Sequence, residues 1–116
     1  MNSSLPLNNL EYMMNIVGIT ACTAGIAHTY IAKEKLIQAA LSLGHSIKVE
    51  TQGSIGVDDK LSPEDIANAD IVILATDIGI GGLERFKNKH VVEVPIATVV
   101  KSPKSLIQKI QEKMQK

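Results

Sequence analysis

The chain has 116 residues with 12 basic and 12 acidic side chains, so its formal net charge is zero, and 45% of its residues are hydrophobic. This composition is typical of one ordinary globular domain that is large enough to bury a core. The neutral charge and the absence of tryptophan argue against a nucleic-acid-binding protein, which needs a basic excess and aromatic surfaces on which bases stack.

The chain contains a single cysteine, Cys22, and no apolar run that approaches the roughly 20 residues needed to cross a bilayer. A lone thiol cannot form an intramolecular disulfide and suits a reducing compartment. Residues 1–14 show no basic region followed by an apolar one, so we expect no signal peptide and no direct membrane insertion. We expect a cytoplasmic protein with a loosely held tail over 1–14, where Met13 and Met14 are alternative natural starts, and one domain over 15–116.

The first half of this domain predicts two strands around a helix. The run Asn15–Ala21 is apolar on both faces, which is typical of a central parallel strand. A helix from about Thr29 to Leu43 is expected from a stripe of apolar residues at helical spacing. Ser46–Thr51 alternates between apolar and polar residues and therefore predicts a half-exposed edge strand. The residues at 52–60 indicate a loop by their composition.

The second half continues the alternation of helices and strands. Ser62 and Pro63 predict the start of a short helix that ends near Ala69. The apolar run Ile71–Ala75 predicts a second central strand, a single helical turn is expected at Leu83–Phe86, and a last strand at about Val91–Val94 ends at a proline. The closing helix begins at Ser102-Pro103 and has the apolar stripe Leu106, Ile107, Ile110 and Met114.

Strands that alternate with helices predict an α/β fold: a single three-layer, Rossmann-like domain with helices on both faces of a four-stranded parallel sheet. Two central strands and one edge strand give the strand order 2-1-3-4, counted along the chain. The chain then reverses its direction of winding beside the first strand, which makes the carboxyl end of that strand the topological switch point where ligands bind. Cys22 follows that strand directly.

The segment after the first strand has the composition of an anion-binding loop that leads into a helix. A lone cysteine is most often an inert buried residue. At a helix N-terminus, however, free N–H groups and the helix dipole favour a thiolate and would also hold phosphoryl oxygens. His28 either orients the phosphoryl group or bonds to backbone, and the two interpretations are evenly balanced. Cys22 is therefore the candidate nucleophile, and the candidate phosphate-binding residues are Thr23, Ala24, Gly25, Ile26, Ala27, His28 and Thr29.

A small cysteine-dependent phosphatase is an alternative from a different class. Such an enzyme needs an arginine that clamps the phosphate, and residues 22–29 contain neither arginine nor lysine. It also needs an acid for the leaving group, and Asp58, Asp59 and Asp77 are offered without specific support. The loop therefore favours a carrier that holds a phosphoryl group over a hydrolase, with no metal and no cofactor.

Five stretches in the same order, at 22–29, 49–56, 61–66, 69–73 and 84–86, resemble the fructose-type enzyme IIB component of the bacterial sugar phosphotransferase system. The resemblance covers residues 14–115. The family usually has proline and threonine after the cysteine, where this chain has Thr23 and Ala24. A non-catalytic regulatory module that keeps the fold is therefore a further alternative.

The resemblance implies a mechanism and its partners. Cys22 would attack a phosphohistidine on a IIA protein, and the phosphoryl group would pass to a sugar that a membrane IIC component transports. Both partners would lie on other chains. A candidate partner surface follows the second strand, although these residues also suit an ordinary turn. The sugar is left open between fructose, a mannitol-like polyol and mannosyl-glycerate. This candidate partner surface comprises Thr51, Gln52, Gly53 and Ser54. Of the remaining polar residues, we expect His45 to be exposed in a turn and Asp77 to cap a loop.

Overall fold

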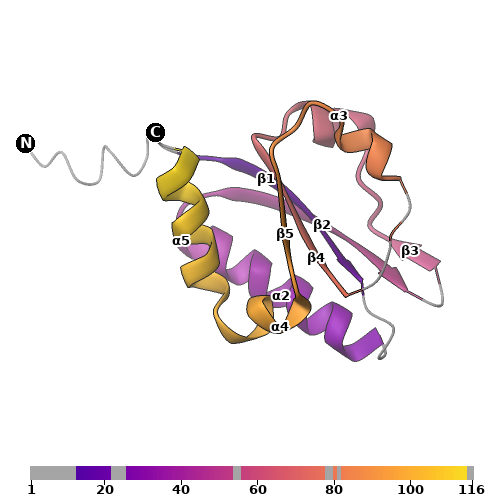
Figure 1. Ribbon diagram of the computed structural model, residues 1–116, viewed down its shortest axis with the longest axis horizontal. Helices are drawn as coiled ribbons and strands as arrows, with labels where there is room; N and C mark the ends of the chain where they lie inside the picture. Colours follow the sequence, from indigo (N-terminus) through magenta and orange to yellow (C-terminus); the bar gives the residue numbers. More distant parts are fainter. Residues whose placement is uncertain (1–12, 22–25, 54–55, 78–79, 81, 115–116) are drawn as a thin grey trace, which may run out of the picture.

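The strand that precedes Cys22 runs through the centre of a twisted sheet (Figure 1). The computed structural model describes residues 13–21, 26–53, 56–77, 80 and 82–114, and all structural statements refer to these. The elements follow in the order β1 (Asn15–Ala21), α2 (Ile26–Ser42), β2 (Ser46–Gly53), β3 (Gly56–Asp58), α3 (Pro63–Ala67), β4 (Ile71–Thr76), the 3₁₀ turn η1 (Leu83–Phe86), β5 (Val91–Val94), α4 (Ile96–Lys101) and α5 (Pro103–Met114).

The sheet has the strand order β3-β2-β1-β4-β5. Strands β2, β1, β4 and β5 are parallel, and β1 pairs with β2 on one side and with β4 on the other. This confirms the predicted order 2-1-3-4 for the parallel strands. The prediction of four strands was wrong, because β3 adds a fifth strand that is antiparallel to β2.

Strand β3 lies within the segment that the composition predicted as a loop. β2 extends to Gly53, and Gly53 pairs with Gly56 at the start of β3, so β2 is not an edge strand. Gly56 has a φ of 123°, a backbone conformation that favours glycine. All three residues of β3 are exposed, so the segment shows no pattern of burial that would reveal a strand.

Helices cover both faces of the sheet, as the three-layer prediction requires. Helices α2, α4 and α5 pack together on one face, whereas α3 and η1 lie on the other (Figure 1). The side chains of β1 alternate between the two faces of the sheet. Ile16 packs with α2 on one face, while Val17 and Ile19 pack with α3 and η1 on the other. Burial on both faces explains why β1 is continuously apolar.

The helix starts were predicted better than the connection before the last helix. Ser62 and Asp65 form a capping box at α3, with the Asp65 N–H donating to Ser62 Oγ at 3.0 Å. Helix α4, in contrast, was not predicted. It contains the consecutive β-branched residues Thr98, Val99 and Val100, which are weak helix formers. Burial of Ile96 and Val99 in the core outweighs that preference.

The predicted exposure of His45 was wrong, because the side chain is only 3% exposed. The Met14 N–H donates to His45 Nδ1 at 3.0 Å, and His45 Nε2 lies 3.0 Å from Gln111 Oε1 on α5. Met14, which we placed in the tail, is itself buried in the core. His45 therefore joins the start of β1 to the last helix.

Candidate functional site

The carboxyl ends of β1, β2 and β4 lie at one edge of the sheet, which we call the rim. β1 leads to α2 and to β2 on one side, and the chain later returns to β4 on the other side, so the rim contains the predicted switch point. Cys22, Thr23, Ala24 and Gly25 lie outside the described residues. The structure describes the two ends that they join, Ala21 at the end of β1 and Ile26 at the start of α2.

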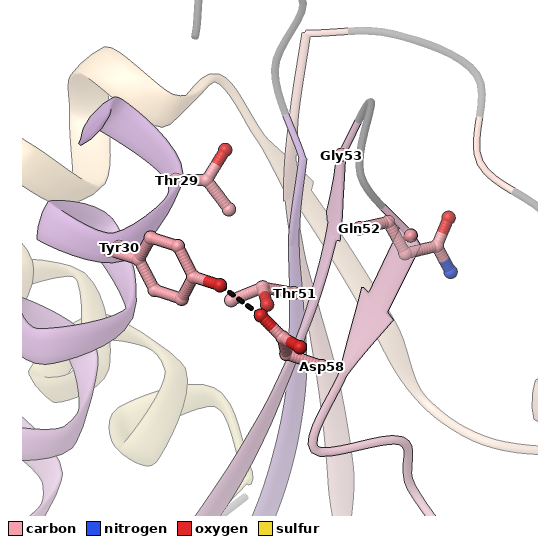
Figure 2. A pocket seen from close by; sticks show the side chains of 7 residues that line it. Thr29, Tyr30, Thr51, Gln52, Gly53 and Asp58 are labelled. Atoms are coloured by element: carbon pink, nitrogen blue, oxygen red, sulfur yellow. Dashed lines mark hydrogen bonds between the residues drawn. The ribbon is translucent and has the colours of Figure 1, made fainter. Parts of the chain in front are cut away.

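Thr29 is the most informative of the predicted phosphate-binding residues. It lies in the first turns of α2 and is 3% exposed, and its backbone carbonyl accepts a hydrogen bond from Thr20 Oγ1 on β1 at 3.2 Å. Thr29 Oγ1 is buried and has no hydrogen-bond partner among the described residues. Figure 2 shows this oxygen directed away from Tyr30. Ile26 and Ala27 form the first residues of α2, and His28 is exposed.

A small pocket brings the two predicted sets of residues together. Thr29 of the phosphate-binding set lines it with three residues of the candidate partner surface (Figure 2). Those three are Thr51, which is buried, Gln52, which is half-buried, and Gly53, which is exposed. Ser54, the fourth residue of that surface, lies outside the described residues. The remaining lining residues are Tyr30, Gly56 and Asp58.

Tyr30 and Asp58 close the pocket on the side of α2. The Tyr30 hydroxyl donates a hydrogen bond to Asp58 Oδ2, and Lys33 forms an ion pair with Asp59 one turn further along the helix. The hydrogen bond to Asp58 is the main cause that raises the pKa of Tyr30. Tyr30 was not predicted as a site residue, because its pairing with Asp58 depends on β3. Asp58 and Asp59 are thus both bound to α2 side chains.

A buried carboxylate lies beside Gln52 on the same face of β2, because Glu50 is two residues earlier on the strand. Glu50 is 1% exposed and receives the guanidinium of Arg85 through two hydrogen bonds, of 2.9 Å to Oε1 and 3.1 Å to Oε2. The Leu61 N–H and Gln52 Nε2 donate to the same carboxylate at 2.9 and 2.8 Å. Burial raises the pKa of Glu50, but these hydrogen bonds outweigh burial and the pKa lies below its ordinary value. The alternation in β2 had indicated an exposed Glu50, which is incorrect.

Asp77 follows β4 at the same rim. Its N–H donates to the carbonyl of Ala21 at 3.2 Å, and its carboxylate Oδ1 accepts the N–H of Ile96 at 3.3 Å. The carboxylate therefore holds the start of α4, in addition to any contact within its own loop.

In the described parts of the chain no helix is long and apolar enough to span a membrane. The same parts hold no group of three or more acidic, histidine or cysteine side chains that could bind a metal ion.

Comparison with known proteins gives one consistent result. Residues 17–109 match the family model described as the lactose/cellobiose-specific IIB subunit of the phosphotransferase system (PTS). The chain is 50% identical over 99 residues to the PTS system fructose-like EIIB component 2 of Escherichia coli strain K12, covering 85% of this chain and 93% of that protein.

A second relative carries the same domain within a longer protein. The PTS system fructose-specific EIIABC component of Bacillus subtilis is 44% identical over 94 residues, which cover 81% of this chain and 15% of that protein. Among solved structures, the enzyme IIB subunit of the PTS system from Escherichia coli K12 superimposes with a TM-score of 0.84 at 32% identity, covering 89% of this chain and 95% of that one.

Proposed function

Since the chain belongs to the IIB family of the PTS, with fructose-like relatives, and is thus a sugar-phosphotransfer component, we propose that Cys22 is its phosphorylated residue. In this proposal a IIA protein donates the phosphoryl group from a phosphohistidine, and Cys22 passes it to a fructose-like sugar during transport by a membrane IIC component. In this proposal the protein acts in the cytoplasm. The fusion of the A, B and C parts named in the Bacillus subtilis relative supports these partners.

Thr29 provides the observation on which the proposal mainly rests. Its buried hydroxyl has no partner among the described residues, and it lies in the first turns of a 17-residue helix that begins beside the switch point. Leaving a buried hydroxyl without a partner costs about 1–3 kcal/mol, so such a group points to a ligand or to a neighbour outside the described residues. The free N–H groups of the helix start favour an anion at the same place.

The proposed chemistry consists of two phosphoryl transfers. The Cys22 thiolate attacks the phosphorus in line, the S–P bond forms as the N–P bond to the donor histidine breaks, and the imidazole leaves with the bonding electron pair. In the second transfer a sugar hydroxyl oxygen attacks the phosphorus, its proton passes to solvent, and the S–P bond breaks to regenerate the thiolate. We propose that Thr29 Oγ1 donates to a phosphoryl oxygen in both steps, because positioning and charge stabilisation dominate phosphoryl transfer.

The position of the only arginine argues against the phosphatase alternative. Arg85 is the single arginine in the sequence, and its guanidinium is bound to Glu50 by two hydrogen bonds. A phosphatase loop needs an arginine that is free to clamp the phosphate in the transition state. An arginine already held by a carboxylate supports the carrier over the hydrolase.

Intact-mass spectrometry at neutral pH tests the proposal. The protein is incubated with phosphoenolpyruvate, the two general phosphotransferase proteins and a set of fructose-type IIA domains. We expect one added phosphoryl group on the native chain and none on Cys22→Ser. Thr29→Val, which keeps the shape of the side chain but lacks the hydroxyl, should slow transfer about 10–100-fold, whereas Thr29→Ser should retain it.

The alternatives give different results in the same experiment. An absence of phosphorylation by every IIA domain would contradict the proposal and favour the regulatory module. Rapid release of inorganic phosphate from the phosphorylated chain without sugar would favour the phosphatase. Phosphorylation that persists in Cys22→Ser would place the acceptor on another residue.

A further inference from the structure

Arg85 and Glu50 connect two segments that are far apart in the sequence and lie on either side of β1. Glu50 is on β2, whereas Arg85 is in η1, which follows β4; β1 separates these two strands in the sheet. Arg85 Nε also donates to the carbonyl of Gly82 at 2.8 Å, and its guanidinium lies 5.1 Å from the centre of the Phe86 ring. One arginine thus joins the segment after β4 to β2.

The other contacts of Glu50 extend this connection to the rim. Gln52 Nε2 donates to Glu50 Oε2 at 2.8 Å, so the carboxylate fixes the orientation of a side chain on the candidate partner surface. The Leu61 N–H donates to Glu50 Oε1 at 2.9 Å and anchors the chain that returns from β3. The segments on both sides of the end of β1 are therefore bound to one ion pair.

Stability alone gives a weak explanation for this arrangement. Desolvating a carboxylate and a guanidinium costs several kcal/mol per ion, and buried ion pairs can often be replaced by apolar residues without loss of stability. What the pair provides, and an apolar pair does not, is fixed geometry. A guanidinium with three directed hydrogen bonds permits one orientation of its partners.

We propose that the Glu50–Arg85 pair is a positioning device that orients Gln52 and the rim around β1 for recognition of the phosphoryl donor protein. The inference rests on the proposed function, because it assigns the rim to the docking of a IIA domain. Neither side chain touches the phosphoryl group. The pair acts through Gln52 on one side of β1 and through the Gly82 carbonyl on the other.

Steady-state transfer from phosphorylated IIA tests the proposal with variants that separate geometry from stability. Arg85→Lys keeps the positive charge but cannot make the same set of directed hydrogen bonds. The double variant Glu50→Leu/Arg85→Met removes both charges together and leaves neither ion unpaired. Lys48→Met is the matched control, because it removes an exposed ion pair to Asp65 from the same face of the same strand.

We expect Arg85→Lys and the double variant to raise the KM for phosphorylated IIA by at least about tenfold. The rate of Cys22 alkylation by iodoacetamide should stay within about twofold of the native protein, since the reactive group itself is not touched. The double variant should remain folded and unfold at a moderately lower urea concentration than the native protein, because it leaves neither ion unpaired but removes the acceptor of the Leu61 N–H. Lys48→Met should leave all three quantities unchanged. A native-like KM in either folded variant would overturn the proposal.

Hydrogen exchange gives a second test that does not depend on phosphoryl transfer. Arg85→Lys should accelerate exchange of the Gln52, Gly53 and Leu61 amides together with those of Ile80 and Gly82, and Lys48→Met should accelerate none of them. If the native protein accepts no phosphoryl group, the proposed function fails while this measurement still decides on the positioning. Unchanged exchange at both sets of amides in Arg85→Lys would show that the pair does not hold the rim.

Discussion

The hydroxyl of Tyr30 on α2 is hydrogen-bonded to the carboxylate of Asp58 on β3, so the short edge strand is tied to the helix that begins at the candidate site (Figure 2). Lys33 on α2 forms an ion pair with Asp59, the residue that follows β3. Strand β3 has only three residues, and its pairing with β2 alone would hold it weakly. The two side-chain contacts fix the β2–β3 hairpin against α2.

The Tyr30–Asp58 contact predicts an unusual tyrosine titration. The hydrogen bond to Asp58 raises the pKa of Tyr30 above the ordinary value of 10.0. A raised pKa in the folded state gives a stabilisation that is complete below pH 10 and is lost as the pH rises through the folded-state pKa. In a Tyr12→Phe background, ultraviolet absorbance should show Tyr30 ionising above pH 10, and Asp58→Asn should lower its pKa. The control Glu112→Gln should not, and an equal pKa in both variants would contradict the contact.

The buried histidine predicts a loss of stability on substitution. His45→Ala leaves the Met14 N–H without its acceptor and Gln111 without its partner. A buried donor without an acceptor costs about 1–3 kcal/mol, so the free energy of unfolding should fall by that amount in urea denaturation. His90→Ala is the control, because His90 is exposed and should change the stability by less than about 0.5 kcal/mol. Similar effects of the two substitutions would argue against the connection between β1 and α5.

The sequence predicted those features that depend on local patterns. The apolar runs of β1 and β4 indicated central strands, the stripe of α2 indicated a helix, and Ser62 with Pro63 indicated a helix start; each is confirmed. The features that were missed depend on contacts between distant residues. The buried Glu50 is paired with Arg85, 35 residues later in the chain, and the buried His45 is hydrogen-bonded to Met14 and Gln111.

In the candidate site, too, the features set by local sequence patterns could be predicted, whereas those set by contacts between distant residues could not. The position of Cys22 after a central strand could be predicted from the chain order alone, and its structure lies outside the described residues. The meeting of Thr29 with Thr51 and Gln52 in one pocket depends on the parallel register of β1 and β2, in which Ala21 pairs with Gln52. Tyr30 had no signal in the sequence, because its partner lies on a strand that the composition did not reveal.

The Glu50 carboxylate predicts a specific loss of stability in acid. Its pKa is below the ordinary value of 4.5, since the hydrogen bonds from Arg85, Gln52 and Leu61 outweigh the effect of burial. A lowered pKa gives a stabilisation that is present above pH 4.5 and is lost as the pH falls through the folded-state pKa. Urea denaturation between about pH 6 and about pH 3 should therefore show a steeper decline for the native protein than for Glu50→Gln. Parallel curves would show that Glu50 does not contribute to acid unfolding.

The close packing of β1 against β4 predicts that Gly18 cannot be enlarged. A Cβ at Gly18 would lie 3.2 Å from the backbone carbonyl oxygen of Ile73, its partner across the sheet. The carbonyl belongs to a central strand and cannot move without disturbing the hydrogen bonds between the strands, so Gly18→Ala should lower the free energy of unfolding by about 1–3 kcal/mol. At Gly53 the added Cβ meets no atom of the described residues within 4 Å.

Gly53→Ala is therefore the matched control, and its stability in urea denaturation should be unchanged or raised by up to about 1 kcal/mol. Substituting alanine for glycine also reduces the entropy of the unfolded chain, which favours folding by about 0.4–1 kcal/mol where the native conformation permits it. A loss of stability at Gly18 must exceed this gain to be observed. Equal stability of the two variants would mean that β1 and β4 can separate to admit a methyl group, and that the strand leading to Cys22 is held less tightly than its packing indicates.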